Sequence, residues 1–505
     1  MKTVTINNFS GGVVDPRETL SNTASSSRHF MLKKTKLEPY RDMETEALDT
    51  GTLADYDITN VIRYNYTGTS QTFFALGHKS GQTYAKIFEK TTDTPSSNFQ
   101  ASTSGEDTTG VVIEGSLIGY KGALYFLKTL TGNTVLCKYV YGGPVSDIGS
   151  IGASPTGSVS VVPQMFIHPK DGRLYMASGY NMGSYDGTTL TTRSFSTNHN
   201  INAITYLGNN IVIGMTSKDS NNSVLGLWDG SLTSSVLTDI VEFGNDTLLI
   251  LENLGDVVVG VSTISVGGSS DVGTENNVII RGYNGGTAQI LRTIQSKAST
   301  NYTRVYAKKA KKNNILYFPA SIHLNGTRTY QIYSFYKNES GQWVLTPDRK
   351  PYNNTELVNE DITSVSTVGD YMWVSFKTSS ATGKLYRTND NEVYTATSSY
   401  ETTVNPNMET SDRSKKKQLK AVSLRCGSPS GASHTVTLSY SVDGGSFTTI
   451  YTGAATSEVR VIEEIKESTG KPFLSAREYI FKIETTGNGE VYELKYAYET
   501  KPTLI

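Results

Sequence analysis

Cysteine is almost absent from this sequence, since Cys137 and Cys426 are the only two among 505 residues. They lie in parts of the chain whose sequence character differs, which argues against both a disulfide framework and a cysteine metal site. We expect two free, buried thiols in a protein made in a reducing cytosol.

Long apolar runs are absent as well. The stretch from Asp256 to Val261 is among the longest, and it falls far short of the roughly 20 residues that span a bilayer. The opening letters, MKTVTINNFSGG, lack the apolar segment of about 7 to 15 residues that a signal peptide needs. We therefore expect no membrane insertion and no export by the signal-peptide route.

The motifs of common catalytic sites are also missing. The sequence contains no HExxH, no CxxC, no GxSxG, no phosphate-binding GxxxxGK[ST] and no GxGxxG between a strand and a helix. Its six histidines are scattered tens of residues apart: His29, His78, His168, His199, His323 and His434. The sequence thus offers no catalytic residue, no cofactor-binding residue, no cofactor and no metal ligand, and we expect the chain not to be an enzyme.

Charge of one sign does not dominate. The formal net charge is -1, so the chain has no overall positive field to attract nucleic acid or an anionic membrane. Two basic runs stand out, Lys308 to Lys312 and Lys415 to Lys417. We interpret both as solvated charge runs or as lysines that protect a sheet edge, with contact to DNA in a channel as the alternative.

The residues that are abundant favour β-structure. Only 18% of the chain is charged, whereas Ser, Thr, Gly, Asn and 31 Tyr are common, a composition typical of many short strands and turns. At this length we expect either two or three domains or one large repeat architecture with an additional domain.

A loose repeat of short strands and tight turns runs from about Tyr56 to about Tyr400. Its period is about 35 to 60 residues in roughly seven copies, and such units bury their faces only by packing side by side. We predict a β-propeller of six to eight blades, preferably seven, over residues 56–408, with a β-solenoid as the weaker alternative. The expected hairpin centres are Lys121-Gly122, Asp171-Gly172, Gly208-Asn209-Asn210, Gly244-Asn245-Asp246, Asn313-Asn314 and Gly369-Asp370.

The sequence changes character near Asn405-Pro406. The charged stretch from Glu409 to Lys420 is interpreted as a joint between domains or as the start of a new sheet. Six alternating strands follow, with a hairpin turn at Asp443-Gly444-Gly445. We predict that residues 409–505 form an antiparallel β-sandwich.

Two features leave a carbohydrate function open. The tryptophans Trp228, Trp343 and Trp373 could stack on sugars, although aromatic pairs that stabilise sheets explain most of them better. Any chain with 47 acidic residues also contains carboxylates that could act as a glycosidase pair. A propeller glycoside hydrolase is therefore kept as an alternative.

The first 55 residues look like an extended arm. Within the segment from Asn7 to Glu18, Gly11 and Gly12 accept backbone angles that other residues avoid. Pro16 fixes its own φ and pushes Asp15 toward extended geometry. These residues predict a programmed bend, which suits an arm that crosses to a neighbouring subunit or a strand that closes the chain's own propeller.

This opening also resembles the start of a group of tailed-bacteriophage virion proteins, the tail nozzle and tail-stabilisation proteins. The likeness rests on NNFSGGVVDPRE, followed by Arg28-His29-Phe30 and by Leu37 to Arg41. A second likeness is the stretch Lys416 to Val422 with Val436 to Phe447, which is similar to the sandwich at the end of phage tail and baseplate proteins. The residues that correspond to the family's arm are Phe9, Gly11, Gly12, Asp15, Pro16 and Arg17.

The resemblance implies a β-propeller protein that is a structural component of a phage virion. Such proteins assemble into homo-oligomeric rings, contact other tail or connector proteins, form or close the DNA channel, and take part in genome ejection. It implies a location in the virion tail after synthesis in the bacterial host cytoplasm, with non-specific contact with passing genomic DNA. The arm would contact a neighbouring subunit. The alternative from a different class is a host-surface or glycan-binding tail protein.

Overall fold

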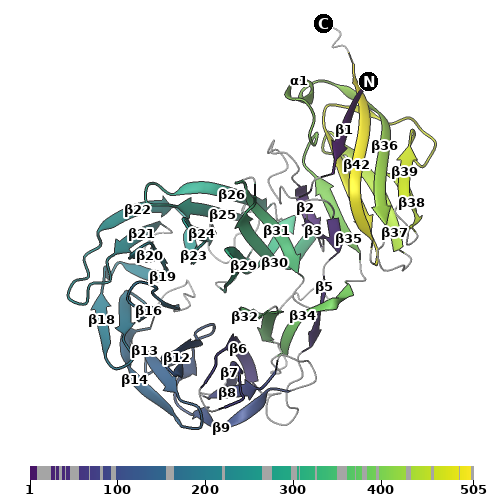
Figure 1. Cartoon of the computed structure of the whole chain (residues 1–505). Helices are drawn as coiled ribbons and strands as arrows, with labels where there is room; N and C mark the ends of the chain where they lie inside the picture. Colours follow the sequence, from purple (N-terminus) through teal and green to yellow (C-terminus); the bar gives the residue numbers. More distant parts are fainter. Residues whose placement is uncertain are drawn as a thin grey trace.

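The chain folds almost entirely into β-strands, with one short helix, α1 (Thr410–Arg413), among the described residues. In Figure 1 a ring of small sheets lies beside a sandwich of two larger sheets. The structure is a computed structural model. It describes residues 1–7, 9, 24–28, 30–32, 37–39, 41–45, 56–66, 69–79, 84–92, 98–154, 164–218, 222–263, 276–296, 304–305, 308–324, 327–339, 341–349, 361–369, 371–377, 384–393, 397–427, 434–455, 460–487 and 489–501.

Seven antiparallel sheets of four or five strands form the ring in the described part of the chain, and we number them sheets 1 to 7 in chain order. Sheet 1 contains β6 (Tyr56–Arg63), β7 (Phe73–Lys79), β8 (Ala85–Lys90) and β9 (Gln100–Asp107). Sheet 2 contains β10 (Val111–Val112), β11 (Ile118–Tyr120), β12 (Ala123–Leu130), β13 (Asn133–Tyr139) and β14 (Val145–Ala153). Sheet 3 contains β15 (Met165–Ile167), β16 (Leu174–Ser178), β17 (Asn181–Tyr185) and β18 (Leu190–Ser194).

Sheets 4 to 7 continue the same pattern. Sheet 4 contains β19 (His199–Leu207), β20 (Asn210–Ser217), β21 (Ser223–Trp228) and β22 (Asp239–Gly244), and sheet 5 contains β23 (Thr247–Asn253), β24 (Val258–Thr263), β25 (Asn276–Tyr283) and β26 (Gln289–Ser296). Sheet 6 contains β27 (Arg304–Val305), β28 (Ala310–Lys312), β29 (Ile315–Leu324), β30 (Thr327–Lys337) and β31 (Trp343–Arg349). Sheet 7 contains β32 (Asp361–Val368), β33 (Tyr371–Lys377) and β34 (Lys384–Val393) with β5 (Arg41–Thr45). The predicted fold class, an all-β propeller followed by an antiparallel sandwich, is confirmed.

Strands in the middle of a sheet differ from those at the rim because they are covered on both faces. In β12 the first six residues are all buried, and the sequence there is almost continuously apolar. In β9, an outer strand, buried and exposed residues alternate instead. Neighbouring sheets in the ring cover the inner strands from both sides, so the pattern of apolar residues follows the position of each strand.

Each sheet shares an apolar cluster with the next one. Phe74 and Leu76 of sheet 1, for example, pack with Leu124 and Phe126 of sheet 2. Equivalent clusters join the remaining neighbours around the ring, including sheet 7 with sheet 1. The ring is therefore closed by packing, and no sheet has to bury its faces alone.

The contact between sheets 7 and 1 is aromatic. Phe99 and Trp373 meet edge to face, with 5.9 Å between their ring centroids. The ammonium of Lys90, a residue that is only 2% exposed, lies 5.5 Å from both centroids. A cation held between two buried rings fixes their orientation at the point where the last sheet meets the first.

Sheet 7 takes its outer strand from the N-terminal part of the chain. β5 pairs with β34, with Glu44 opposite Arg387. Strands from both ends of the propeller sequence therefore share one sheet. Because the chain continues from β5 into β6 of sheet 1, pulling sheet 1 far from β32, β33 and β34 would strain this ladder as well as break the aromatic contact.

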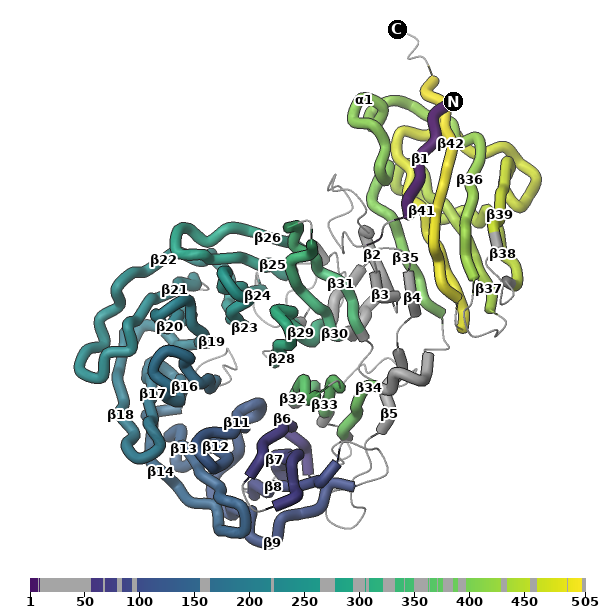
Figure 2. The backbone as a smooth tube through the Cα atoms, viewed as in Figure 1, coloured from purple at the N-terminus to yellow at the C-terminus, as the bar shows by residue number. Residues whose placement is uncertain are grey.

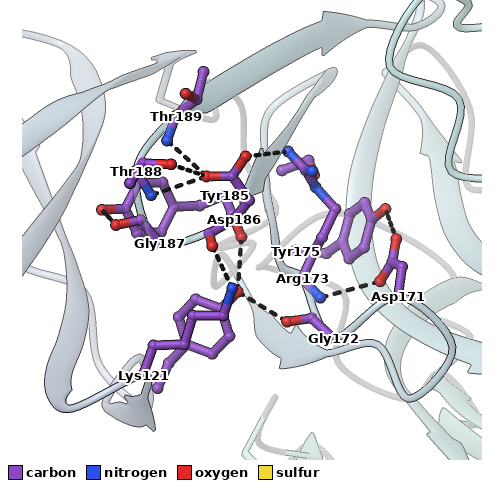
Figure 3. A network of polar contacts seen from close by, with 12 residues as sticks. Lys121, Asp171, Gly172, Arg173, Tyr175, Tyr185, Asp186, Gly187, Thr188 and Thr189 are labelled. Atoms are coloured by element: carbon purple, nitrogen blue, oxygen red, sulfur yellow. Dashed lines mark hydrogen bonds and ion pairs between the residues drawn. The ribbon is translucent and has the colours of Figure 1, made fainter.

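Polar contacts between turns add to the apolar packing of sheets 2 and 3, as Figure 3 shows. The ammonium of Lys121 donates to the backbone oxygen of Asp186 at 2.5 Å, and the hydroxyl of Tyr120 donates to the backbone oxygen of Gly172 at 2.8 Å. Within sheet 3, Arg173 lies 3.4 Å from the Asp186 carboxylate. The first two bonds fix the turn at Lys121 in sheet 2 against the turns at Gly172 and Asp186 in sheet 3.

The Asp186 side chain also shapes its own turn. Its Oδ1 accepts hydrogen bonds from the backbone N–H groups of Thr189 at 2.8 Å and Thr188 at 2.9 Å. Hydrogen bonds from the Thr189 backbone, then from the Thr188 hydroxyl and backbone, hold the pKa of Asp186 well below its usual range. This network serves the packing of the ring, since it joins the turn at Lys121 in sheet 2 to the turns at Gly172 and Asp186 in sheet 3.

The sandwich consists of two sheets that enclose one apolar core. In Figure 2 it lies beyond β31 and β34, with the N-terminus next to β42. One sheet contains β1 (Lys2–Ile6), β3 (Phe30–Leu32), β4 (Leu37–Pro39), β36 (Lys417–Gly427), β39 (Arg460–Glu464), β40 (Ser475–Ala476) and β42 (Glu490–Thr500); the other contains β2 (Ala24–Arg28), β35 (Ser398–Thr402), β37 (His434–Val442), β38 (Thr448–Ala455) and β41 (Tyr479–Thr485).

The described strands of residues 1–55 do not form a separate arm. β1 pairs with β42, β2 pairs with β35, and β4 continues the ladder on β42, so these strands belong to the sandwich, whereas β5 belongs to sheet 7. The predicted boundary between residues 408 and 409 also shifts, because β35 lies in the sandwich. Sequence periodicity could not show this, because strand pairs across the chain decide which sheet a strand joins.

The predicted hairpin turns are mostly confirmed. Lys121 and Gly122 have φ of 43° and 78°, and Asn313 and Asn314 have φ of 51° and 60°, the left-handed values of a tight two-residue turn. The prediction is wrong at Gly244-Asn245-Asp246, which joins β22 of sheet 4 to β23 of sheet 5. A connection between sheets uses the same turn residues as a hairpin, so local sequence does not distinguish them.

Aromatic residues and cysteines lie where the sequence suggested. Trp228 and Trp373 are each 1% exposed within apolar clusters, and Trp343 stacks on Phe335. Cys137 and Cys426 are not joined in a disulfide and are both buried, in the propeller and the sandwich respectively. In the part of the chain that the structure describes, no helix has the length and apolar character needed to cross a membrane.

Candidate functional site

A partly open cavity of about 210 Å³ lies where the innermost strands of the ring converge. Its lining comes from sheets 1, 2, 3, 6 and 7, and the lining residues lie in an innermost strand or just before one. Asn60 and Ser364 lie in innermost strands, whereas Glu114, Gln164 and Lys308 come just before them. The complete lining is Asn60, Glu114, Gly115, Leu117, Gln164, Met165, Lys308, Lys309, Ser364 and Val365.

An ion pair crosses the ring at this cavity. The ammonium of Lys308 in sheet 6 lies 2.7 Å from the carboxylate of Glu114 in sheet 2, 194 positions earlier in the sequence. Lys308 is only 7% exposed, whereas the Glu114 side chain is 42% exposed. Sheets 7 and 1 lie between these two partners along the ring, so the pair connects parts of the propeller that share no strand ladder.

The neighbouring lysines attach to sheet 5. The ammonium of Lys309 lies 2.9 Å from Glu252 Oε2 and donates to the backbone oxygen of Leu251. Lys311 lies 3.8 Å from Glu252 Oε1 and donates to the backbone oxygen of Asn253. One glutamate is thus shared by two lysines.

This geometry corrects the interpretation of the run from Lys308 to Lys312 as a solvated charge run. The run forms part of the innermost strand of sheet 6, and Lys308, Lys309 and Lys311 are all paired with glutamates. The sequence could not show this because both glutamates come from other sheets. Glu114 itself carries no sequence signal beyond its place before the strand Ile118–Tyr120.

The polar side chains of the cavity are held in place by bonds outside it. Asn60 donates to the Leu117 backbone oxygen at 3.1 Å and accepts from the Ser366 hydroxyl at 2.6 Å. Gln164 accepts from the backbone N–H of Ile204 at 3.4 Å, and Ser364 bonds to Ser375 at 2.6 Å. The cavity walls are therefore ordered without a ligand.

The chemistry of the cavity is that of a polar binding site. Glu114 is the one carboxylate among its described lining residues, and it already pairs with Lys308. A glycosidase needs two carboxylates about 5 to 10 Å apart. The described lining also holds no aromatic ring that could stack on a sugar.

Of the six residues predicted to form an assembly arm, the structure describes only Phe9. Its ring is fully buried in the sandwich core of its own chain and meets Tyr400 edge to face at 5.6 Å. It follows β1, whose Ile6 lies opposite Leu494 in β42. Gly11, Gly12, Asp15, Pro16 and Arg17 lie outside the described residues, so their contact with a neighbouring subunit stays a prediction.

The start of β1 is fixed by an ion-pair cluster. Lys2 lies 2.6 Å from both Glu409 and Asp412, and the hydroxyl of Tyr498 donates to Asp412 at 3.0 Å. The hydrogen bond from Lys2 lowers the pKa of Asp412 to about 2, with Lys415 and Tyr498 acting in the same direction against the effect of burial. The cluster attaches β1 to helix α1.

Lys417 corrects the interpretation of the second basic run as solvated. Its side chain is fully buried, and its ammonium donates to four backbone oxygens, those of Asp412, Arg413, Lys415 and Arg477. Burial lowers the pKa of Lys417 to about 8, although Asp412 opposes this shift. The charged stretch from Glu409 to Lys420 therefore belongs to the sandwich and is not a joint between domains.

One group of possible metal ligands lies in sheets 1 and 2. Ligand atoms of Asp107, Cys137 and Asp147 lie within 4.8 Å of one another. The ammonium of the buried Lys128 lies 2.6 Å from Asp107 and 2.7 Å from Asp147, and burial raises the pKa of the Cys137 thiol. Lys128 thus already supplies the positive charge that a cation would bring to this group.

No protein-family model and no curated protein matches the chain. Among solved structures it is similar to Raptor from Chaetomium thermophilum at 11% identity, with a TM-score of 0.39 over 67% of this chain and 30% of that one. It is similar to the exo-beta-1,3-galactanase of Phanerochaete chrysosporium at 12% identity, with a TM-score of 0.28 over 90% and 100% of the two chains. Hsv2 from Kluyveromyces lactis gives 8% identity and a TM-score of 0.36 over 70% and 95%.

These comparisons correct one expectation. We predicted from missing motifs that the chain is not an enzyme, but the similar structures include enzymes, the exo-galactanase and a further glycoside hydrolase. Missing motifs therefore do not exclude an enzyme, because carboxylates from distant blades can form a site that contains no short sequence motif. At these TM-scores the similarities assign no activity to the chain.

We predict that Glu114→Gln weakens the propeller. The change leaves the Lys308 ammonium without its carboxylate in a largely buried position, and we expect a loss of roughly 1 kcal/mol in unfolding free energy. Denaturant titration followed by tryptophan fluorescence measures it, because all three tryptophans lie in propeller sheets. Glu106→Gln, which removes a peripheral pair with Lys86, is the matched control and should change little. Equal midpoints for Glu114→Gln and the wild type would contradict the prediction.

We predict that Phe9→Ala destabilises the sandwich by about 3 to 5 kcal/mol, because it empties a fully buried aromatic site. Amide hydrogen exchange of peptides from β36, β41 and β42, followed against urea, reports on this domain, whereas tryptophan fluorescence reports on the propeller. The exchange midpoint should shift and the tryptophan transition should not. Phe447→Ala, at a ring that is 37% exposed, is the control. A shift no larger than that of the control would show that β1 is not part of the folded core.

We predict that acid weakens the attachment of β1 through Asp412. Its pKa of about 2 in the folded chain lies below the ordinary value of 3.8, so between these values the unfolded chain binds more protons. The stabilisation is present above about pH 4 and is lost as the pH falls through about 2. The difference in urea midpoint between wild type and Asp412→Asn should therefore shrink from pH 6 to pH 2. Glu463→Gln serves as the exposed control, and a constant Asp412→Asn difference would refute this assignment.

Proposed function

We propose that this chain is a structural component of a tailed-bacteriophage virion, in the nozzle, ring or stabilisation part of the tail. It would act as a homo-oligomer that forms or closes the DNA channel and contacts other tail or connector proteins. It would be made in the cytoplasm of the bacterial host and located in the virion tail. Two stretches of sequence support this proposal, NNFSGGVVDPRE and the sandwich segment Val436 to Phe447.

The observation that carries the proposal is the path of the N-terminal segment. The part of the chain with the resemblance supplies β1 to β4 to the sandwich and β5 to sheet 7 of the propeller. Pulling the two domains apart would break strand ladders in both. A component that must hold its shape while a genome passes benefits from this construction.

Exposed apolar side chains supply contact surfaces for assembly. Ile240 on β22 and Ile290 on β26 are each 61% exposed at the rim of sheets 4 and 5. On the sandwich, Val461 of the edge strand β39 is 61% exposed and the following Ile465 is 70% exposed. In this proposal these side chains contribute to contacts with neighbouring subunits or other tail proteins.

DNA contact, in this proposal, is non-specific. The formal net charge is -1, and the lysines at the propeller axis are paired with glutamates. A channel wall with little net attraction lets a polyanion slide, whereas a strongly basic wall would retain it.

The first test is the oligomeric state of the full chain and its presence in particles. Native mass spectrometry and light scattering should give a closed ring of several copies, and antibodies against the chain should label the tail in micrographs of phage that encodes it. A stable monomer that is absent from purified virions would overturn the proposal.

The same preparation distinguishes the proposal from a carbohydrate function. Incubation with a panel of bacterial surface polysaccharides should release no reducing ends and show no saturable binding. Turnover of one polysaccharide by a monomer that virions lack would replace the structural function with that of a hydrolase. Saturable glycan binding in the assembled tail would instead identify a host-surface binding protein.

A further inference from the structure

A buried lysine joins sheets 1 and 2 away from the axial cavity. The ammonium of Lys128 in β12 lies 2.6 Å from Asp107 Oδ2, at the end of β9, and 2.7 Å from Asp147 Oδ1 in β14. The Lys128 side chain is 1% exposed and that of Asp107 is 9% exposed, whereas Asp147 is 43% exposed. One buried amine therefore contacts a buried carboxylate and a second carboxylate that solvent reaches.

The two oxygens of the Asp107 carboxylate have different surroundings. Oδ1 accepts hydrogen bonds from the backbone N–H of Thr109 at 2.9 Å and from the Thr109 hydroxyl at 2.8 Å. Oδ2 faces the Lys128 amine, which also donates to the Thr109 hydroxyl at 2.8 Å. Two donors at Oδ1 stabilise the negative charge that develops on this oxygen when an amine adds to the carboxyl carbon. Oδ2 is then the oxygen that can leave.

The Lys128 amine starts in its protonated form. Burial acts to lower the pKa of Lys128, but hydrogen bonds with Asp107 and Asp147 outweigh it and raise this pKa overall. Only the neutral amine is a nucleophile, so a proton has to move before any reaction, and this step makes the reaction slow. Burial assists the transfer to Asp107, because it removes two charges from a buried position at once.

We propose that Lys128 and Asp107 form an intramolecular amide bond, with Asp147 as the proton carrier. The ammonium of Lys128 gives one proton to Asp107 Oδ2, and the neutral amine attacks Asp107 Cγ. The nitrogen passes a second proton to Asp147, which delivers it to Oδ2. The bond between Cγ and Oδ2 breaks, one water molecule leaves, and Asp147 is a carboxylate again. The product is an amide between Nζ and Cγ, and the reaction consumes no oxidant and no further reactant.

The fold supplies what this reaction lacks in water. Contact between the amine and the carboxyl group corresponds to a very high effective concentration of one for the other. The amide bond connects the end of β9 in sheet 1 with β12 in sheet 2, so these two sheets stay joined even when their packing is lost. This inference does not depend on the proposed location in a phage tail.

Intact mass spectrometry of the full chain tests the bond. After prolonged incubation of the folded chain at physiological temperature, we expect a mass lower by one water molecule than that of a sample kept in urea throughout. Peptide mapping should then recover one branched peptide that contains Asp107 and Lys128. An unchanged mass would overturn the proposal. Loss of water without a branched peptide, or a branch at Asp147, would overturn it as well.

Lys128→Arg is the first variant. Arginine keeps a positive charge between Asp107 and Asp147, but its guanidinium is always protonated and does not attack a carboxyl carbon, so the folded variant should keep its full mass. Asp147→Asn retains both amide partners and removes the proton carrier. We expect it to form the amide roughly 100-fold more slowly. Loss of water in folded Lys128→Arg, or the wild-type rate in Asp147→Asn, would contradict this mechanism.

The pair between Lys86 and Glu106 is an internal control. It also joins a lysine to a carboxylate, at 3.1 Å between β8 and β9, but the Glu106 side chain is 40% exposed. We expect no branched peptide from this pair in the same digest. Tryptophan fluorescence shows which variants keep the propeller, and only these are compared. A branch at Lys86 would show that linkage does not require a buried, oriented pair and would refute the assignment.

Discussion

The closure of the ring is the constraint on which the rest of the structure depends. A sheet of four short strands cannot bury both of its faces, so each sheet in the ring relies on its neighbours. The last contact, between sheets 7 and 1, includes the Phe99 and Trp373 rings, and the outer strand of sheet 7 is β5. Because β5 comes from the N-terminal segment, closing the propeller also fixes the chain that leads back to the sandwich.

Closure also explains the charges at the axis. Five of the seven sheets contribute residues in or just before their innermost strands to one cavity of about 210 Å³. The run from Lys308 to Lys312 would be unstable there without carboxylates, and Glu114 and Glu252 supply them from sheets 2 and 5. The result is one ion pair across the ring, between Lys308 and Glu114, and further pairs from sheet 6 to Glu252 in the neighbouring sheet 5.

The sequence predicts those features that local residues decide. Strand periodicity and turns such as Lys121-Gly122 or Asn313-Asn314 predict the propeller and six of the strands of the sandwich, because positive φ and alternation are local properties. The groups that surround a lysine side chain, by contrast, are not determined by the residues next to it in the sequence. Lys308 and Lys417 lie in similar-looking basic runs, yet one is paired across the ring and the other is enclosed by backbone oxygens. The partners of β5 and Glu114 are likewise invisible without the fold.

The strand order has a consequence for biosynthesis. β1 and β4 pair with β42, so these strands have to wait for a partner that is made much later. At about 5 to 20 residues per second, the delay between them is roughly 25 to 100 s. β5 waits in the same way for β34. The propeller can close once β34 has been made, whereas the sandwich is complete only once β42 has been made, and until then the strand edges that pair with β42 stay exposed.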